Sequence, residues 1–258
     1  MKQGYAILGA IVVAGMLLLS GCIGSDGGGF VVNKVVEAQK NVKQYTFESE
    51  TIYKVPGMEA AVTMPMNGKV DVENKKMYIN ISTAELIVEL YLIGGEMYIK
   101  QAEQWIKMTK SDLEQGRSGM SGFEDLAKQY EKTVEILKSS QTKIDVVGEE
   151  SVDGVVCYKV NVVPDAEKLK EQISENSTVP GIETINVSSY TVYVDKATNF
   201  IKKEDANFDI DISVQGMKMK INRQMKFVYN GINKQIDIQL PEGAKNATPM
   251  TEVNQVYL

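Results

Sequence analysis

Alternation of apolar and polar residues is the feature that most constrains how this chain can fold. In residues 207–214, for example, Phe208, Ile210 and Ile212 alternate with acidic, amide and hydroxyl side chains. Successive side chains of a β-strand point to opposite faces, so a period of two predicts a strand with one apolar and one solvated face. Strand-like segments extend over residues 46–55, 68–72, 77–82, 85–93, 96–100, 142–150, 154–163, 190–195, 200–214, 217–230 and 234–240, and residues 85–93 are apolar on both faces.

Three further segments carry apolar residues at helical spacing. Residues 31–45 and 166–173 each have one apolar stripe, and residues 121–138 begin with Ser121 and Glu124, which form an S-x-x-E capping box. The helices interrupt runs of strands that are joined by short turns, so the order of elements predicts an α+β fold with one large antiparallel sheet.

The N-terminus has the pattern of an export signal. Lys2 is followed by residues 5–19, which are uncharged and mostly apolar. A membrane span needs roughly 20 apolar residues, so a cleaved signal peptide is favoured over an uncleaved anchor. Small residues then precede Cys22, an arrangement that resembles the lipobox of bacterial and archaeal lipoproteins and implies a lipid on this cysteine. An ordinary leader that happens to contain Cys22 is the alternative.

These features predict three parts of the chain: a signal peptide over residues 1–21, a lipidated cysteine with a flexible tether over residues 22–29, and one folded domain over residues 30–258. A lipid on Cys22 would hold the domain at the outer face of the cell membrane. Four N-x-S/T sequons fit an exported glycoprotein, at Asn80, Asn176, Asn186 and Asn246.

Composition argues against several classes of function. Lys2 is the only charge among residues 1–21, so the rest of the chain has 27 basic and 34 acidic residues, and we expect no nucleic-acid partner. Histidine is absent, which excludes catalytic triads and His-based zinc sites. The remaining cysteine, Cys157, lies in a strand-like run and is expected to be buried. We therefore predict no metal, no cofactor and no enzymatic activity.

Two acidic segments resemble chemical sites. Asp205, Asn207 and Asp209 have the spacing of a calcium loop, but Ile210 replaces the glycine that such a loop needs. Residues 148–154 gather three carboxylates in a turn between two predicted strands, where turn chemistry is the simpler explanation. A pocket with converging carboxylates would instead favour an extracytoplasmic enzyme.

Methionine is frequent on the predicted strands, often at a spacing of two. Its flexible side chain suits both ordinary core filling and the lining of a ligand site, and the sequence favours neither. Arg223 interrupts the last apolar series, where we expect a bend or bulge. The candidate lining residues are Met64, Met66, Met77, Ile79, Val88, Leu90, Met97, Trp105, Phe208, Ile210, Met217, Met219, Ile221, Met225 and Phe227.

Several of these features together resemble the LolA/LolB/LppX-like superfamily of lipoprotein carriers. They are the lipobox, an opening helix that leads into VKQYTFESE, the run of hairpins, the helix at residues 121–138 and the run GEESVDGVVCYKV at residues 148–160. The resemblance implies an incomplete antiparallel β-barrel wrapped around two to three helices. It also implies that the concave apolar face binds an acyl chain, a lipoprotein or a glycolipid.

The expected function is therefore that of a membrane-anchored extracytoplasmic lipoprotein that binds a lipid or another hydrophobic ligand. A structural or adhesive surface lipoprotein with a filled core is the alternative. The soluble carrier of the superfamily has no anchor, so the lipobox does not favour shuttling between membranes. The sequence points to no particular protein partner.

Overall fold

The structure is a computed structural model. It describes residues 28–57, 60–83, 87–101, 103–109, 111–112, 141–176, 181–214 and 217–252. The helix expected over residues 121–138 and the leader lie outside these residues.

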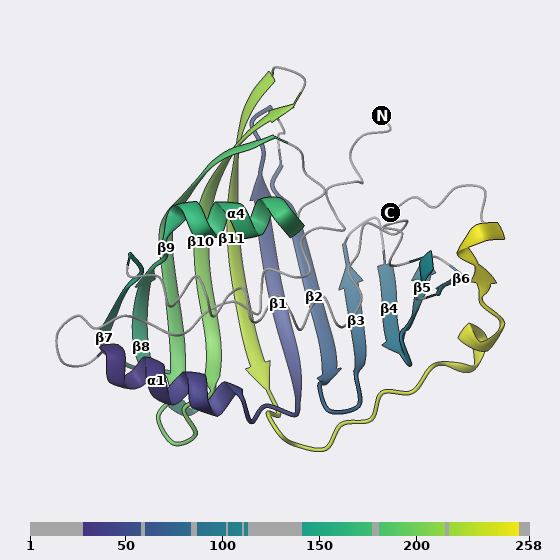
Figure 1. Cartoon of the computed structure of the whole chain (residues 1–258), viewed down its shortest axis with the longest axis horizontal. Helices are drawn as coiled ribbons and strands as arrows, with labels where there is room; N and C mark the ends of the chain where they lie inside the picture. Colours follow the sequence, from purple (N-terminus) through teal and green to yellow (C-terminus); the bar gives the residue numbers. More distant parts are fainter. Residues whose placement is uncertain are drawn as a thin grey trace.

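One large sheet dominates the described part of the chain, and two α-helices accompany it (Figure 1). The predicted α+β class and the antiparallel sheet are confirmed. The helices are α1 (Gly28–Gln39) and α4 (Ala166–Asn176). The strands are β1 (Gln44–Lys54), β2 (Val62–Asp71), β3 (Lys76–Ser82), β4 (Ile87–Ile93), β5 (Glu96–Gln101), β6 (Gln104–Met108), β7 (Lys143–Val152), β8 (Val155–Val163), β9 (Ile182–Asp195), β10 (Ile201–Val214), β11 (Met217–Asn230) and β12 (Thr248–Pro249).

The sheet has the order β12-β6-β5-β4-β3-β2-β1-β11-β10-β9-β8-β7 and does not close into a barrel. Strands that follow one another in the chain are neighbours in the sheet from β1 to β6 on one side and from β7 to β11 on the other, and α4 lies in the connection between β8 and β9. The two halves meet where β1 pairs with β11, from Thr46 opposite Asn230 to Lys54 opposite Asn222. All neighbouring strands are antiparallel except β12, which pairs in parallel with β6.

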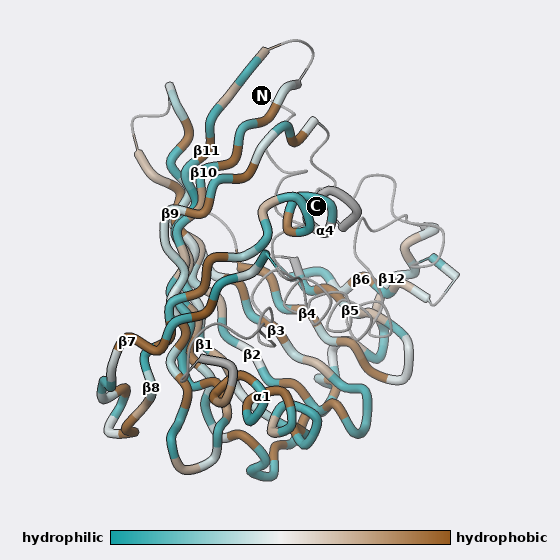
Figure 2. The backbone as a smooth tube through the Cα atoms, turned by 60° about the vertical axis from the view of Figure 1, so that its left-hand side comes forward, coloured by the Kyte–Doolittle hydropathy of each residue, from teal (hydrophilic) through white to brown (hydrophobic). Residues whose placement is uncertain are grey.

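Both helices lie on the concave side of this curved sheet (Figure 2). Val32 and Val35 of α1 are completely buried and belong to the same apolar core as the strands. Leu169 of α4 packs against Ile185 of β9 and against apolar side chains of β9 and β10. An open sheet with helices on its concave face is the half-barrel that the superfamily resemblance implies.

Turn chemistry explains the connection between β7 and β8. Asp153 and Gly154 have φ values of 49° and 79°, and a two-residue hairpin turn of this handedness requires a positive φ at both positions. Glycine and aspartate adopt this conformation at low cost.

The centre of the concave face is tightly packed, and Gly68 is required there. The ring of Phe47 stacks on Phe227 with 4.8 Å between centroids. A Cβ atom at Gly68 would lie 2.5 Å from the Phe47 ring and 2.6 Å from the carbonyl oxygen of Tyr78, so no larger residue fits. Gly68 thus lets an aromatic ring lie flat against β2.

Three expectations about element boundaries and register were wrong. The helix expected over residues 31–45 ends at Gln39, because from Gln44 the chain pairs with β2 and β11. Residues 234–240 form no strand. The backbone N–H of Ile236 donates a hydrogen bond to the side chain of Gln44 and not to the backbone of a neighbouring strand. Arg223 causes no bulge, because the pairing of β11 with β10 continues through it without a shift.

Candidate functional site

The concave face carries fourteen of the fifteen residues predicted to line a ligand site. Directly paired residues of neighbouring strands point to the same face, and the pairing connects all fourteen to the face of Phe47 and Phe227. These residues are Met64, Met66, Met77, Ile79, Val88, Leu90, Met97, Phe208, Ile210, Met217, Met219, Ile221, Met225 and Phe227.

Trp105 was assigned to the wrong face. In β6, Ile106 and Met108 are buried on the concave side. Trp105 precedes Ile106, so it points to the opposite, convex side. There its ring lies 5.8 Å from that of Tyr91. Trp105 is therefore not part of the concave face.

Burial divides the fourteen residues into two groups. Ile79, Met97 and Phe227 are at most 2% exposed, so they form packed core. Along β11, exposure rises from Met225 through a partly exposed Met219 to Met217, which is 63% exposed. The partly exposed members are Met66, Val88, Phe208, Ile210 and Met219. Only the partly exposed and exposed members can contact a ligand without a rearrangement of the core.

The exposed end of this face belongs to the β10–β11 hairpin, which projects beyond the body of the domain (Figure 1). Close to its base, Phe208 and Ile210 pack against the cluster of Leu169 and Ile185. Helix α4 thus lies beside the apolar surface that runs onto the hairpin. The candidate site is this part of the concave face, next to α4.

A buried polar group lies on the same face, and the sequence interpretation missed it. Arg223 is 7% exposed, and its Nη2 lies 3.7 Å from the Met225 sulfur. Its guanidinium carbon lies 5.8 Å from the centre of the Tyr53 ring. Among the described residues, Arg223 Nε, Tyr53 Oη and Ser49 Oγ are buried without a hydrogen-bond partner. The signal available in the sequence was the odd-numbered register of Arg223 within an apolar series.

A second buried polar group is fully paired. Tyr190 and Tyr229 both donate hydrogen bonds to the carboxyl group of Glu204, the latter over 2.7 Å. Burial is the main cause that raises the pKa of Glu204 to about 8, while the two hydrogen bonds oppose the shift. Glu204 is therefore protonated at neutral pH and links β9, β10 and β11.

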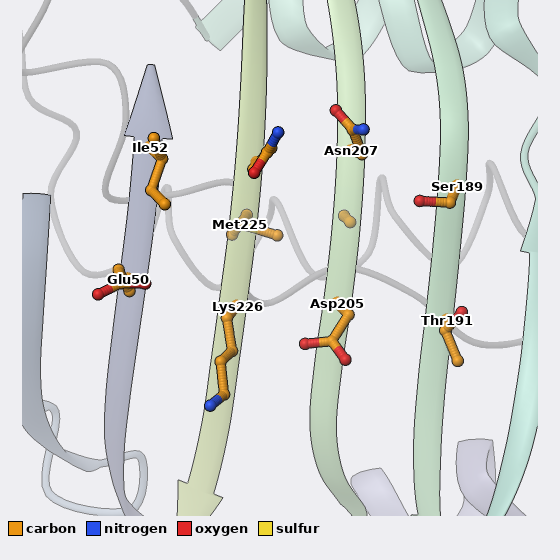
Figure 3. A pocket seen from close by; sticks show the side chains of 10 residues that line it. Glu50, Ile52, Ser189, Thr191, Asp205, Asn207, Met225 and Lys226 are labelled. Carbon is orange, nitrogen blue, oxygen red and sulfur yellow. The ribbon is translucent and has the colours of Figure 1, made fainter. Parts of the chain in front are cut away.

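The convex face carries a polar groove of about 370 Å³ (Figure 3). Its side chains stand on four neighbouring strands, and Glu50, Asp205, Asn207 and Lys226 are among them. The acidic and amide residues of 205–211 thus occupy the solvated side of β10, as the alternation predicted. Within the described ranges, no group of three acidic or cysteine side chains has the geometry of a metal site.

The carboxylates of residues 148–154 are each paired with a lysine. Lys159 lies 2.9 Å from Glu150, Lys196 pairs with Glu149, and a third lysine lies 3.3 Å from Asp153. The described residues therefore show no converging pair of free carboxylates at this turn. Cys157, nearby on β8, is buried. Burial is the main cause that raises the pKa of its thiol to about 11, and nearby acidic side chains contribute less. A thiol of this kind is protonated and unreactive at neutral pH.

Three of the four sequons fall on described side chains. Asn186 and Asn246 are exposed, and Asn80 is partly exposed on the convex face, away from the apolar residues of β3. The side chain of Asn176 lies outside the described ones. Among the described helices, none is long and apolar enough to span a membrane.

Residues 30–249 match the family model described as "Family of unknown function (DUF6612)". The chain belongs to this family. No curated protein matches the sequence of this DUF6612 member.

Solved structures identify the fold of this DUF6612 protein. The lipoprotein LppX of Mycobacterium tuberculosis superposes with a TM-score of 0.51 and 13% identity, over 81% of this chain and 97% of LppX. At this identity the likeness concerns the fold alone, and it confirms the fold that the resemblance to the LolA/LolB/LppX-like superfamily implied. A LolA superfamily protein of Nitrosomonas europaea also matches, with 10% identity. The match covers 83% of this chain and 96% of that protein, but its TM-score of 0.30 adds no argument.

Proposed function

We propose that this protein is a membrane-anchored extracytoplasmic lipoprotein that binds a lipid or another hydrophobic ligand against the concave face of its half-barrel. The observation that carries the proposal is the apolar surface that continues from the buried core onto partly exposed positions beside α4. A contiguous apolar surface left accessible on a folded domain is typical of a ligand-binding or interaction site. The fold shared with the lipoprotein LppX supports this assignment.

The proposed anchor is a lipid on Cys22, after removal of residues 1–21, and the sequons are proposed to carry glycans on the cell surface. Binding rather than catalysis fits the paired carboxylates and the protonated Cys157 thiol. A structural or adhesive role is the second candidate. The completely packed centre of the face, around Phe47 and Phe227, favours that alternative.

The substitution Met219→Glu distinguishes the two functions. If the face binds a ligand, the variant loses the co-purifying lipid but keeps most of its thermal stability, since Met219 is only partly buried and water can reach the new carboxylate. Native mass spectrometry before and after lipid extraction measures the bound lipid, and circular dichroism measures the melting temperature. If the face is filled core, the variant unfolds at a markedly lower temperature and the wild type contains no lipid.

Gln224→Glu is the matched control, because this substitution adds the same negative charge to the same strand, but on the convex side. Its lipid content and melting temperature should equal those of the wild type. Equal lipid content in the wild type and the Met219→Glu variant would remove Met219 from the site.

A separate prediction concerns the anchor. Cys22→Ala should abolish lipidation, because no other cysteine lies near the leader. The intact mass of the membrane-extracted protein decides this: the wild type should begin at a diacylated residue 22, and the variant should lack the added mass. An unmodified Cys22 in the wild type would contradict the anchor.

A further inference from the structure

Arg223 is a buried cation without a counter-ion in the described part of the chain. Its side chain is 7% exposed, it makes no ion pair there, and its Nε has no hydrogen-bond partner. The guanidinium group cannot lose its proton in a protein, so the charge remains in this environment. A buried charge without a partner is strongly unfavourable, and proteins retain such groups mainly where they serve a function.

The side chains beside Arg223 cannot neutralise it. On the concave face, its cross-strand neighbours are Tyr53 on β1 and Phe208 on β10. The residues two positions away on its own strand are Ile221 and Met225, of which Met225 supplies the weak sulfur contact. Among the described residues, the direct sheet neighbours of the charge on this face are therefore apolar or aromatic.

Two more unsatisfied polar atoms lie on the same face. Tyr53 Oη and Ser49 Oγ are both buried without a hydrogen-bond partner among the described residues, and both belong to β1. Burial raises the pKa of Tyr53, although Arg223 opposes the shift, so its hydroxyl keeps its proton and can donate. Tyr53 lies directly opposite Arg223, so a hydroxyl group and a guanidinium group stand side by side, and an anionic headgroup would satisfy both.

The choice of basic residue is consistent with anion recognition. The chain contains two arginines, Arg117 and Arg223, against twenty-six lysines. A guanidinium group presents a planar set of donors that fits carboxylate and phosphate oxygens, which an ammonium group does not.

We propose that the ligand is an anionic amphiphile, and that Arg223, after a local rearrangement of the side chains that cover it, pairs with its carboxylate or phosphate headgroup while the hydroxyl of Tyr53 donates a hydrogen bond to it. The inference rests on the proposed hydrophobic site and names the chemical class that this site takes. The acyl chain would lie along the apolar residues beside Arg223, including Phe208 and Met219.

Matched single-chain probes test the proposal. Binding of dodecyl phosphate, dodecanoate and dodecanol to the delipidated wild-type protein is measured by calorimetry below the critical micelle concentrations. We expect at least one of the two anions to bind about tenfold or more tightly than dodecanol, since a charge-assisted hydrogen bond contributes about this much. Arg223→Met should lose this preference and bind dodecanol within about twofold of wild type.

Lys226→Met is the matched control. It removes one positive charge from the same strand, but Lys226 is exposed in the convex groove, so the preference for the anions should persist. Removal of the unpaired charge should also raise the melting temperature of the ligand-free Arg223→Met variant by about 3 °C. If that variant does not fold, Tyr53→Phe replaces it, with several-fold weaker anion binding and unchanged dodecanol binding expected.

The possible failures are distinguishable. Binding of dodecanol without any preference for the anions would preserve the hydrophobic site and overturn the assignment of Arg223, as would a preference that survives in Arg223→Met. Inorganic phosphate that binds as tightly as dodecyl phosphate would indicate a free-anion site and would also overturn the headgroup assignment. No binding of any dodecyl compound would overturn the proposed function as well.

Discussion

Replacement of Glu204 by glutamine should stabilise the domain at high pH and leave its stability unchanged near pH 4. The carboxyl group has a pKa of about 8 in the folded protein, against an ordinary value of 4.5. A carboxyl whose pKa is raised on folding favours the folded state while it is protonated, below pH 4.5. That contribution is lost as the pH rises from 4.5 through 8, because the unfolded chain releases its proton first.

The size of the effect follows from the shift. A rise from 4.5 to about 8, or about 3.5 pKa units, corresponds to about 5 kcal/mol, so Glu204→Gln should be more stable than wild type by about this amount at pH 9. At pH 4 the two proteins should be equally stable, since the amide has nearly the shape of the protonated acid. Urea unfolding at a series of pH values from 4 to 9 measures the difference.

The matched control for this experiment is Asp205→Asn. Asp205 is the next residue on β10, but it faces the convex groove and pairs with Lys203 at 2.5 Å. A surface pair of this kind contributes less than about 1 kcal/mol, so the control should show almost no pH-dependent difference from wild type. A stability difference between wild type and Glu204→Gln that does not grow with pH would contradict the raised pKa of Glu204.

Phe227→Ala should lower the free energy of unfolding by about 3–5 kcal/mol. The ring is 2% exposed and stacks on Phe47, so its removal leaves a cavity at the junction of β1 and β11. Those two strands join the halves of the sheet, so a local collapse that fills the cavity would disturb both. The midpoint and slope of urea unfolding provide the measurement.

Lys226→Ala, one position along the same strand, is the comparison for Phe227→Ala. Lys226 is exposed on the opposite face, and its truncation should change stability by less than about 0.5 kcal/mol. A loss below about 1 kcal/mol for Phe227→Ala would show that this part of the face is loosely packed. The proposed site would then have to extend into the centre of the sheet.

The strands and their faces were predictable because a period of two records which residues point the same way. Phe208 and Ile210 fall on the concave side for this reason, and the same parity shows that Glu204 faces inward. Trp105 was placed on the wrong face because the prediction did not use its position within the strand. Ile106 and Met108 occupy the concave side of that short strand, so Trp105 points the other way. Hydropathy alone does not tell which face a large aromatic residue covers.

The pairing of distant strands could not be predicted in the same way. No local pattern indicates that β1 lies beside β11, because that pairing depends on how the whole sheet is ordered. The surroundings of Arg223 depend on it too: the residue looked like an interruption of the apolar series, and the pairing shows that its direct neighbours on the two adjacent strands are Tyr53 and Phe208. The sequence therefore placed Arg223 in the apolar series but did not show which residues would lie beside it.

An open sheet has two edges whose unpaired backbone groups can recruit strands from other molecules and start aggregation. Here each edge strand carries an obstacle. In β7 the pairing shifts between Val146 and Gly148, so a bulge interrupts its regular hydrogen-bonding groups. At the other end β12 is two residues long and includes Pro249, which has no N–H group to offer. The half-barrel can thus keep its concave face open without exposing a long regular edge to neighbouring molecules.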